Sequence, residues 1–262
     1  MRLGFIGMGN MALALAEGFI KAGKLAPADM IAYAPNQKKL GENAARLGFC
    51  QASTAMEVGA TADLVVMACK PAQIEDALSS LGDTIKEKAL ISIALGWDHA
   101  RYRAALSTGT RVQFVMPNTP AAVGEGVFLF EEEHSLKEEE LALAKELFGA
   151  LGTVITLPSS QMGIGGAVAG CGPAFVDMMI EAFADAGVKY GLTRANALRM
   201  TAQMVLGSAK LQLLSGKHPG ELKDAVCSPG GSTIKGVTAL EQAGFRANCI
   251  SAIDAIMQPT KK

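Results

Sequence analysis

Short apolar runs of high strand propensity alternate with helical patterns over the first 160 or so residues of the chain. Such alternation is typical of a parallel sheet covered by helices on both faces. It predicts six strands before residue 120 and two closing strands after it. The predicted strands cover residues 3–6, 30–34, 49–51, 63–69, 90–94 and 112–116, then 127–130 and 153–157.

Helical spacing of apolar residues connects several of these strands. Met11, Leu15 and Phe19 recur along one face after the first strand, and Gly23 follows where a helix C-terminal cap belongs. Ser135 with Glu138 three residues later matches a capping box and predicts the start of another helix.

Residues 148–176 contain no charged side chain, which raises the question of a membrane span. Pro158 and a cluster of glycines interrupt this stretch. We expect it to form a buried strand, a loop and the start of a helix.

Strand-like runs nearly vanish after Pro158, and long helical stretches replace them. The pattern predicts helices over residues 173–190, 193–216, 219–226, 233–243 and 245–257. The predicted fold class is therefore an α/β Rossmann-type dinucleotide-binding domain, residues 1–158, followed by an all-helical domain, residues 159–262. Apolar residues wrap widely around the helices, which favours a homodimer formed through the helical domain.

Composition narrows the range of partners. The 24 basic residues nearly balance the 25 acidic ones, so no charge excess favours nucleic acid or an anionic membrane. The five cysteines form no Cys-x-x-Cys pair and no zinc-like spacing. We expect a reduced cytoplasmic protein with no metal site and no signal peptide.

The string Gly7-Met8-Gly9-Asn10-Met11-Ala12 follows the first strand and opens the first helix. In that context the backbone N–H groups and the helix N-terminus face a diphosphate, which predicts a dinucleotide site. Alone, the string is also compatible with a tight turn that binds nothing.

The residues at the end of the second strand indicate whether NADH or NADPH binds. NAD sites usually carry a carboxylate there, but Asp29 precedes the strand, and the proper end runs from Ala34 through Asn36 to Lys38 and Lys39. Without a carboxylate, a 2′-phosphate is tolerated, so NADPH is favoured over NADH, which stays the alternative. The two lysines are equally compatible with a solvated helix start.

Three further strand ends are expected at the cofactor. Ala68-Cys69-Lys70-Pro71 follows the fourth strand, Ala94 ends the fifth, and Asn118 follows the sixth. In open α/β sheets such loops bind ligands, so Asn118 is a candidate contact for the nicotinamide half and the substrate. The adjacent prolines are also explained by shaped turns alone.

A second glycine-rich segment lies between two predicted helices. Its residues Ser228, Gly230 and Gly231 expose backbone N–H groups that suit a carboxylate. Ser232 or Thr233 then offers a hydroxyl to a substrate nitrogen, or alternatively caps the following helix.

Residues 1–258 resemble the pyrroline-5-carboxylate reductases. The resemblance is most specific in the run His218-Pro219-Gly220-Glu221-Leu222-Lys223-Asp224 and in the segment from Val226 to Ile234. The glycine string, Lys70-Pro71 and Met116-Pro117-Asn118-Thr119-Pro120 support it.

The resemblance implies NAD(P)H-dependent reduction of the cyclic imine 1-pyrroline-5-carboxylate to L-proline. It implies that the glycine loop binds the substrate carboxylate, that Thr233 contacts the ring nitrogen and that Val226 lines the pocket. It also implies a helical dimerisation domain, with dimers that in some members assemble into larger rings. The segment Ala169-Gly170-Cys171-Gly172-Pro173-Ala174-Phe175 departs from the family pattern by lacking three hydroxyls, and Ser232 is a milder change.

Hydride transfer to an imine requires little acid–base machinery, and none of the three histidines has a catalytic context. Two other functions remain open. One is a related dehydrogenase of small hydroxy acids or other imines, with a proton-carrying lysine among Lys189, Lys210, Lys217, Lys223 and Lys235. The other is a dinucleotide-sensing dimer without turnover.

Overall fold

The computed structural model describes residues 1–106 and 109–258. The chain divides into two compact units, Met1–Cys171 and Gly172–Lys262. Each unit is described by itself.

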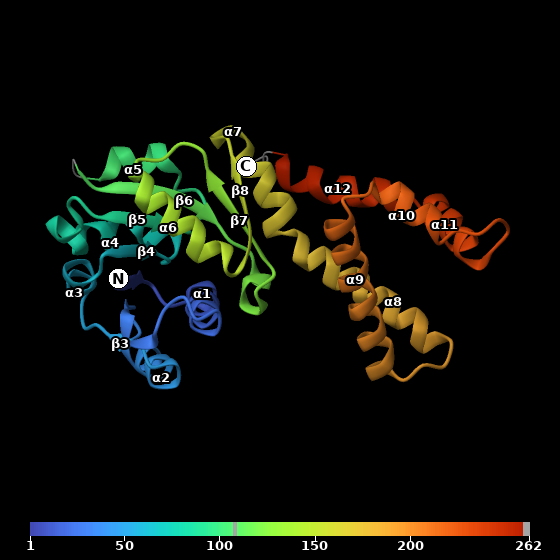
Figure 1. Cartoon of the computed structure of the whole chain (residues 1–262), viewed down its shortest axis with the longest axis horizontal. Helices are drawn as coiled ribbons and strands as arrows, with labels where there is room; N and C mark the ends of the chain where they lie inside the picture. The colour runs from blue at the N-terminus through green and yellow to red at the C-terminus, as the bar shows by residue number, and fades with distance from the viewer. Residues whose placement is uncertain (107–108, 259–262) are drawn as a thin grey trace. The chain divides into compact units, whose positions relative to one another are not determined.

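The first unit is built on an eight-stranded sheet (Figure 1). All eight predicted strands are present, with ends that differ from the prediction by at most two residues, and their order is β3-β2-β1-β4-β5-β6-β7-β8. Every neighbouring pair is parallel except β6 and β7, a reversal that the sequence pattern did not predict. The strands are β1 Leu3–Ile6, β2 Met30–Tyr33, β3 Cys50–Gln51, β4 Leu64–Met67, β5 Ala89–Ser92, β6 Arg111–Met116, β7 Gly126–Glu131 and β8 Gly152–Leu157.

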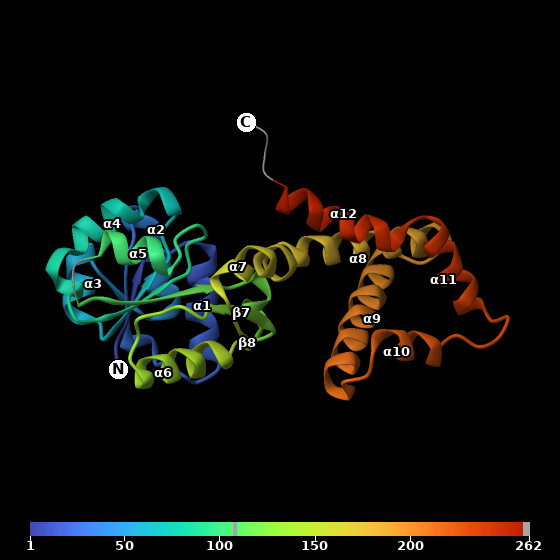
Figure 2. The same ribbon diagram turned by 90° about the horizontal axis from the view of Figure 1, so that it is seen from above.

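Helices cover both faces of this sheet (Figure 2). One apolar core joins the sheet to α1 Asn10–Lys21, α2 Gln37–Leu47 and α6 Glu138–Gly149. The other joins it to α3 Ala55–Thr61, α4 Ile74–Leu81 and α5 His99–Ala105. Strand β1 feeds both cores because Phe5 and Ile6 point to opposite faces. The predicted Rossmann-type architecture is confirmed.

The cap of α1 matches the prediction, but that of α6 does not. Gly23 follows α1 with a φ of +65°. The capping box assigned to Ser135 and Glu138 is wrong, because α6 begins at Glu138 and the N-cap is Lys137, whose N–H donates to Glu140 over 2.9 Å. The Ser135 hydroxyl instead accepts a hydrogen bond from the N–H of Val112 in β6.

Residues 148–176 also differ from expectation. The strand β8 lies at the sheet edge and is half exposed rather than buried, and the expected loop is helical. It consists of α7 Ser159–Gly165 followed by the π-helical turn η5 Gly166–Gly170. The glycines permit close packing here rather than breaking the helix, since a Cβ on Gly165 would lie 2.6 Å from Leu157.

The helical run Ser159–Lys189 is long and apolar enough to cross a membrane by length and composition, and 6% of its most apolar window is buried. Length and composition alone do not separate such a span from a helix covered by another subunit. The absence of a membrane partner stays a prediction.

The second unit is all-helical, as predicted. It contains α8 Gly172–Lys189, α9 Arg194–Ser215, α10 Pro219–Ala225, α11 Ser232–Gln242 and α12 Phe245–Met257. Thr193 caps α9 through its hydroxyl, and Gly216 ends it in the left-handed conformation. Large apolar side chains stay exposed along these helices, including Met178, Leu206, Leu211, Leu213 and Ile250.

Lys88 fastens the C-terminus of α3 to the start of β5. Its ammonium group donates to the carbonyl of Gly59 and to those of Ala62 at 2.8 Å and Ala60 at 3.3 Å. The last carbonyls of a helix lack intrahelical partners, so a cation there satisfies them and complements the helix dipole.

We predict that Lys88→Met lowers the free energy of unfolding by about 1–3 kcal/mol, since charge-assisted hydrogen bonds are lost from partly buried carbonyls. Urea denaturation measures the change. Lys86→Met, at an exposed position two residues earlier, is the control and should change stability little. Equal losses in both variants would contradict this role.

Candidate functional site

Gly7 brings the end of β1 against the end of β4. Its φ is +95°, and a Cβ there would lie 2.6 Å from the backbone nitrogen of Cys69 and 2.8 Å from the carbonyl of Ala68. Its N–H donates to the carbonyl of Tyr33 over 2.7 Å. Only glycine fits this position, because an added side chain would meet immovable backbone.

Gly9 differs from Gly7 because the surrounding space would admit a side chain. It is the N-cap of α1, it makes no side-chain cap, and a Cβ built on it has nothing within 4 Å. The N–H groups of the first helical turn therefore lack a capping side chain and face an open approach. Asn10 is exposed, Met11 is half-buried, and both Met8 and Ala12 are buried in the core. Diphosphate binding at this turn stays a prediction, and the uncapped, open helix N-terminus is compatible with it.

A cavity of about 170 Å³ adjoins this turn. It is lined by Gly7, Tyr33, Pro35 and Cys69 from the strand ends, and by side chains of α4 and the residue before it. The sequence pattern gave no sign that this helix lines the cavity, because only the fold brings it beside the glycine turn. The lining residues here are Gln73, which precedes the helix, and Asp76, Ala77 and Ser80 within it. Gly7 and Cys69, predicted separately, lie in one site.

The end of β2 carries no carboxylate. Asp29 belongs to the short helix η1 Pro27–Asp29, which precedes the strand, as expected. Asn36 caps α2 by accepting from the N–H of Lys39 over 3.0 Å. Lys38 and Lys39 are exposed in the first turn of α2. Their side chains are therefore accessible to a phosphate and are not packed into the protein.

A side chain of the loop after β5 donates a hydrogen bond to the loop after β4 and holds it in place. The indole N–H of Trp97 donates to the carbonyl of Pro71 over 3.1 Å, and the guanidinium of Arg101 lies 4.1 Å from the Trp97 ring. Burial raises the pKa of the Cys69 thiol to about 11, so the thiol is protonated and unreactive near neutral pH. Ala94 is buried, Ala68 is partly buried and Lys70 is exposed. Trp97 carried no signal in the sequence.

Asn118 is buried and engaged by protein groups. Its amide nitrogen donates to the carbonyl of Ala169 over 3.0 Å, and its amide oxygen accepts from the N–H of Val127 over 2.9 Å. It is 6% exposed. Its contact with nicotinamide or substrate stays a prediction.

The second glycine segment lies in the helical unit and forms a tight turn. The N–H of Gly231 donates to the carbonyl of Ser228 over 3.0 Å, and Gly230 has a φ of +69°. Pro229 followed by such a glycine is the signature of a type II turn. This geometry presents the N-terminus of α11 to solvent.

Neither hydroxyl after this turn caps the helix. The N-cap of α11 is Gly231, and no side chain caps it. The capping alternative for Ser232 and Thr233 is therefore wrong. Both residues are exposed, their hydroxyls make no hydrogen bond within the described residues, and Val226 nearby is 64% exposed.

Two of the three histidines make hydrogen bonds that stabilise local structure. His218 accepts from the N–H of Gly220 through Nδ1, and the backbone of His99 donates to Glu131 over 2.8 Å. Burial lowers the pKa of His134, so it is neutral at physiological pH. Over residues 1–106 and 109–258, no group of three His, Cys, Asp or Glu side chains could hold a metal ion.

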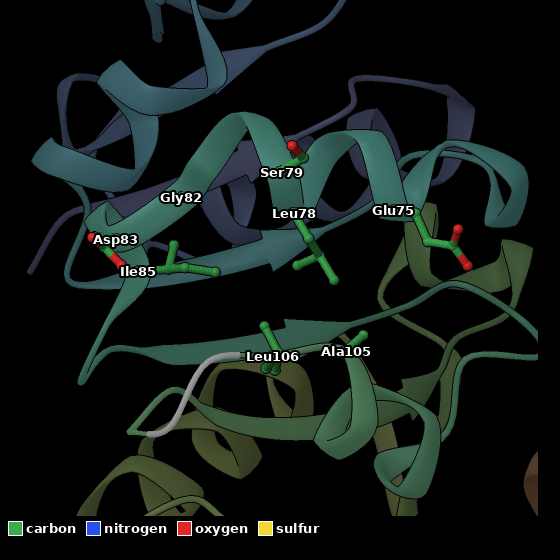
Figure 3. Close-up of a pocket in the computed structure, with 8 residues that line it drawn as sticks. All are labelled: Glu75, Leu78, Ser79, Gly82, Asp83, Ile85, Ala105 and Leu106. Atoms are coloured by element: carbon green, nitrogen blue, oxygen red, sulfur yellow. The ribbon is translucent and has the colours of Figure 1, made fainter.

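A second groove in the first unit, of about 340 Å³, lies between α4 and the end of α5 (Figure 3). Leu78 projects into it from α4, facing Leu106, and Glu75 and Asp83 stand toward its two ends. Its lining residues contain no cation and no glycine turn that would suit a diphosphate. This groove therefore does not compete with the glycine turn as the predicted dinucleotide site.

We predict that Gly9→Ala leaves the melting temperature nearly unchanged but weakens NADPH binding at least tenfold, because the new Cβ occupies the approach to the helix N-terminus. Gly7→Ala is the contrasting variant and should lower stability, because its Cβ strikes backbone. Thermal unfolding and fluorescence titration separate the two effects. Unchanged NADPH affinity in Gly9→Ala would refute the site.

Comparison with known proteins gives two family models and many relatives. Residues 159–262 match the model for pyrroline-5-carboxylate reductase dimerisation, and residues 2–96 match that for NADP oxidoreductase, coenzyme F420-dependent. The pyrroline-5-carboxylate reductase of Treponema pallidum is 40% identical over 98% of this chain and 99% of its own. That of Escherichia coli is 38% identical over 100% and 97%.

Solved structures agree. The pyrroline carboxylate reductase of Plasmodium falciparum, determined with NADP bound, superposes with a TM-score of 0.88 at 30% identity, over 98% of this chain and 95% of its own. The Coxiella burnetii reductase gives the same TM-score and identity over 97% and 95%. A reductive aminase from Aspergillus terreus, at 19% identity and a TM-score of 0.59, shares the fold. By this full-length similarity, the chain belongs to the pyrroline-5-carboxylate reductase family.

Proposed function

We propose that the protein reduces 1-pyrroline-5-carboxylate to L-proline with NADPH, the last step of proline synthesis and the known role of its family. The observation that carries this proposal is that two open helix N-termini are present in a chain that matches the family over its whole length. One is the open helix N-terminus at Gly9, and the other is the uncapped turn before Thr233.

The cofactor residues fit a dinucleotide phosphate. The α1 N-terminus binds the pyrophosphate, and the cavity beside Tyr33 and Pro35 accepts the adenosine half. Asn36, Lys38 and Lys39 line the position of the 2′-phosphate, with no carboxylate to repel it. Lys70, Pro71 and Ala94 extend the binding surface toward the nicotinamide. The bound nicotinamide supplies the hydride.

The turn Ser228–Gly231 binds the substrate carboxylate through backbone N–H groups and the N-terminus of α11. Thr233 stands two residues into that helix with an unengaged hydroxyl, and we assign it to the ring nitrogen. Val226 and Ser232 complete the pocket. These groups orient the imine so that the C=N carbon, which becomes C5 of proline, receives the hydride, while the electrons of the C=N bond go to the protonated nitrogen.

Residues 159–262 match a dimerisation model, so the protein is a homo-oligomer that acts on a small molecule. We assign its basic unit as a homodimer whose helical domains cover the exposed apolar faces of α8 and α9, with rings of dimers as a further step. We assign residues 1–158 to the cofactor and residues 159–262 to dimerisation and substrate binding, in a cytoplasmic enzyme.

The alternatives receive less support. A hydroxy-acid dehydrogenase requires a proton-carrying lysine, but Lys223 is paired with Asp224, and Lys189 lies 5.6 Å from the Tyr190 ring. The side chains of Lys210, Lys217 and Lys235 form no hydrogen bond or ion pair with the residues that the structure describes.

Mixing the protein with NADPH and 1-pyrroline-5-carboxylate and following absorbance at the nicotinamide band tests the proposal. Loss of absorbance with formation of proline supports it. A sensor would bind NADPH without oxidising it, and a hydroxy-acid dehydrogenase would ignore the imine, so either result would overturn it.

We predict that Thr233→Ala lowers kcat/KM for the imine about ten- to a hundredfold, since a hydrogen bond to a charged group contributes about 1.5–3 kcal/mol. NADPH affinity should stay near that of the parent. Thr233→Ser keeps the hydroxyl and is the matched control. Equal loss of cofactor and substrate binding would count against the assignment.

Sedimentation at micromolar concentration tests the dimer. We expect at least twice the chain mass of 27.2 kDa. Monomers at that concentration would show that the exposed apolar faces are not subunit contacts.

A further inference from the structure

We infer that Asn118 is a positioning residue that holds the π-helical turn η5 against the cofactor-binding edge of the sheet, and not a ligand of the substrate. This inference rests on the proposed function for its kinetic consequences only. Its structural basis is the pair of hydrogen bonds that the Asn118 amide makes to two separate elements.

The first hydrogen bond extends the sheet. Strands β6 and β7 pair with Met116 opposite Leu129, so the same register places Asn118 opposite Val127. No backbone pair is formed there. The side-chain oxygen of Asn118 instead accepts from the N–H of Val127 over 2.9 Å, which adds one rung where the ladder has ended.

The second hydrogen bond reaches the π-turn. In η5 the N–H of Cys171 donates to the carbonyl of Gly166, five residues earlier, over 3.1 Å. Such turns are wider than an α-helix and are frequent at functional sites. The Ala169 carbonyl in this turn accepts from the Asn118 amide over 3.0 Å.

Packing reinforces the brace. Gly166 is buried, and a Cβ there would strike the sulfur of Met116, two residues before Asn118. The turn is therefore held by backbone proximity at Gly166 and by a side-chain amide at Ala169. Both contacts come from the chain that leaves β6.

The location gives this brace a functional meaning. Strand β6 is parallel to β5, which is parallel to β4, so Asn118 leaves the sheet at the same edge as Ala68 and Ala94. Ligands of open α/β sheets bind outside this edge. With both ends of its amide engaged and 6% of its surface exposed, Asn118 acts on the substrate through the placement of η5.

Asn118→Asp tests the inference, because it keeps the acceptor for Val127 and removes the donor to Ala169. At pH 8 we expect kcat/KM for the imine to fall at least tenfold, with NADPH affinity within twofold of the parent. Amide exchange should accelerate at Cys171 and stay protected at Val127.

Lower pH supplies a rescue. A protonated carboxyl has both a donor and an acceptor, and burial raises the pKa of such a group because it disfavours the charged form. The ratio of variant to parent kcat/KM should therefore rise toward one as the pH is lowered from 8. Asn196→Asp, an exposed change in α9, is the control and should show no such recovery.

Three outcomes would overturn the inference. A fall in kcat/KM with unchanged exchange at Cys171 would indicate a direct ligand, and unchanged kinetics with faster exchange would indicate a structural role alone. A fall without recovery at low pH would show that the donated hydrogen bond to Ala169 is not what matters.

If Asn118→Asp does not fold, Gly166→Ala is a second test, because its Cβ displaces the turn by pushing against the flexible Met116 side chain. If this variant shows faster exchange at Cys171 but the kinetics of the parent, the inference is also overturned. Inactivity of the parent protein would overturn the proposed function and leave the exchange prediction standing.

Discussion

The approach of Gly7 to the backbone of Ala68 and Cys69 is the constraint on which the cofactor site depends. Parallel strands β1 and β4 pair from Leu3 with Leu64 to Ile6 with Met67. Directly beyond that register, the chain has three residues, 7–9, in which to turn before α1 begins at Asn10. With a Cβ at residue 7 the two strand ends would separate, and the N-terminus of α1 would no longer stand over the edge of the sheet. The same contact places Cys69 in a site where its thiol stays protonated.

The chain combines a unit whose core is largely buried with one that leaves much of its apolar surface uncovered. Strands β1, β4 and β5 are buried between two helical layers, whereas α8, α9 and α12 expose residues such as Met178, Leu213 and Ile250. Apolar faces of this extent are expected to be covered in the native assembly. The turn before Thr233 belongs to the same unit, between α10 and α11, so the proposed dimer faces and the proposed substrate site lie in one unit.

Much of this architecture could be predicted from the sequence because local signals agree with the final fold. Strand β1, helix α12 and the glycine that ends α9 followed from apolar periodicity and turn chemistry. The helical run over residues 159–170 could not, because its glycines serve close packing against Leu157 and Met116, which only the folded sheet reveals. The capping box at Ser135 failed since a tertiary partner, the N–H of Val112, took its hydroxyl.

The candidate site also contains residues that the sequence could predict and residues that it could not. Residues whose predicted roles depend on backbone geometry, such as Gly7, Gly9 and Gly230, could be identified from their sequence context. Gln73, Asp76 and Trp97 were not, because they reach the cofactor edge through tertiary packing and belong to no local motif. The substrate itself was named by family resemblance and not by residue spacing.

The most direct measurement of the central claim is the fate of the transferred hydrogen. With NADPH deuterated at both C4 positions of the nicotinamide and 1-pyrroline-5-carboxylate as the acceptor, mass spectrometry should show L-proline with one deuterium at C5. Proline without deuterium, or consumption of NADPH without proline, would contradict the account.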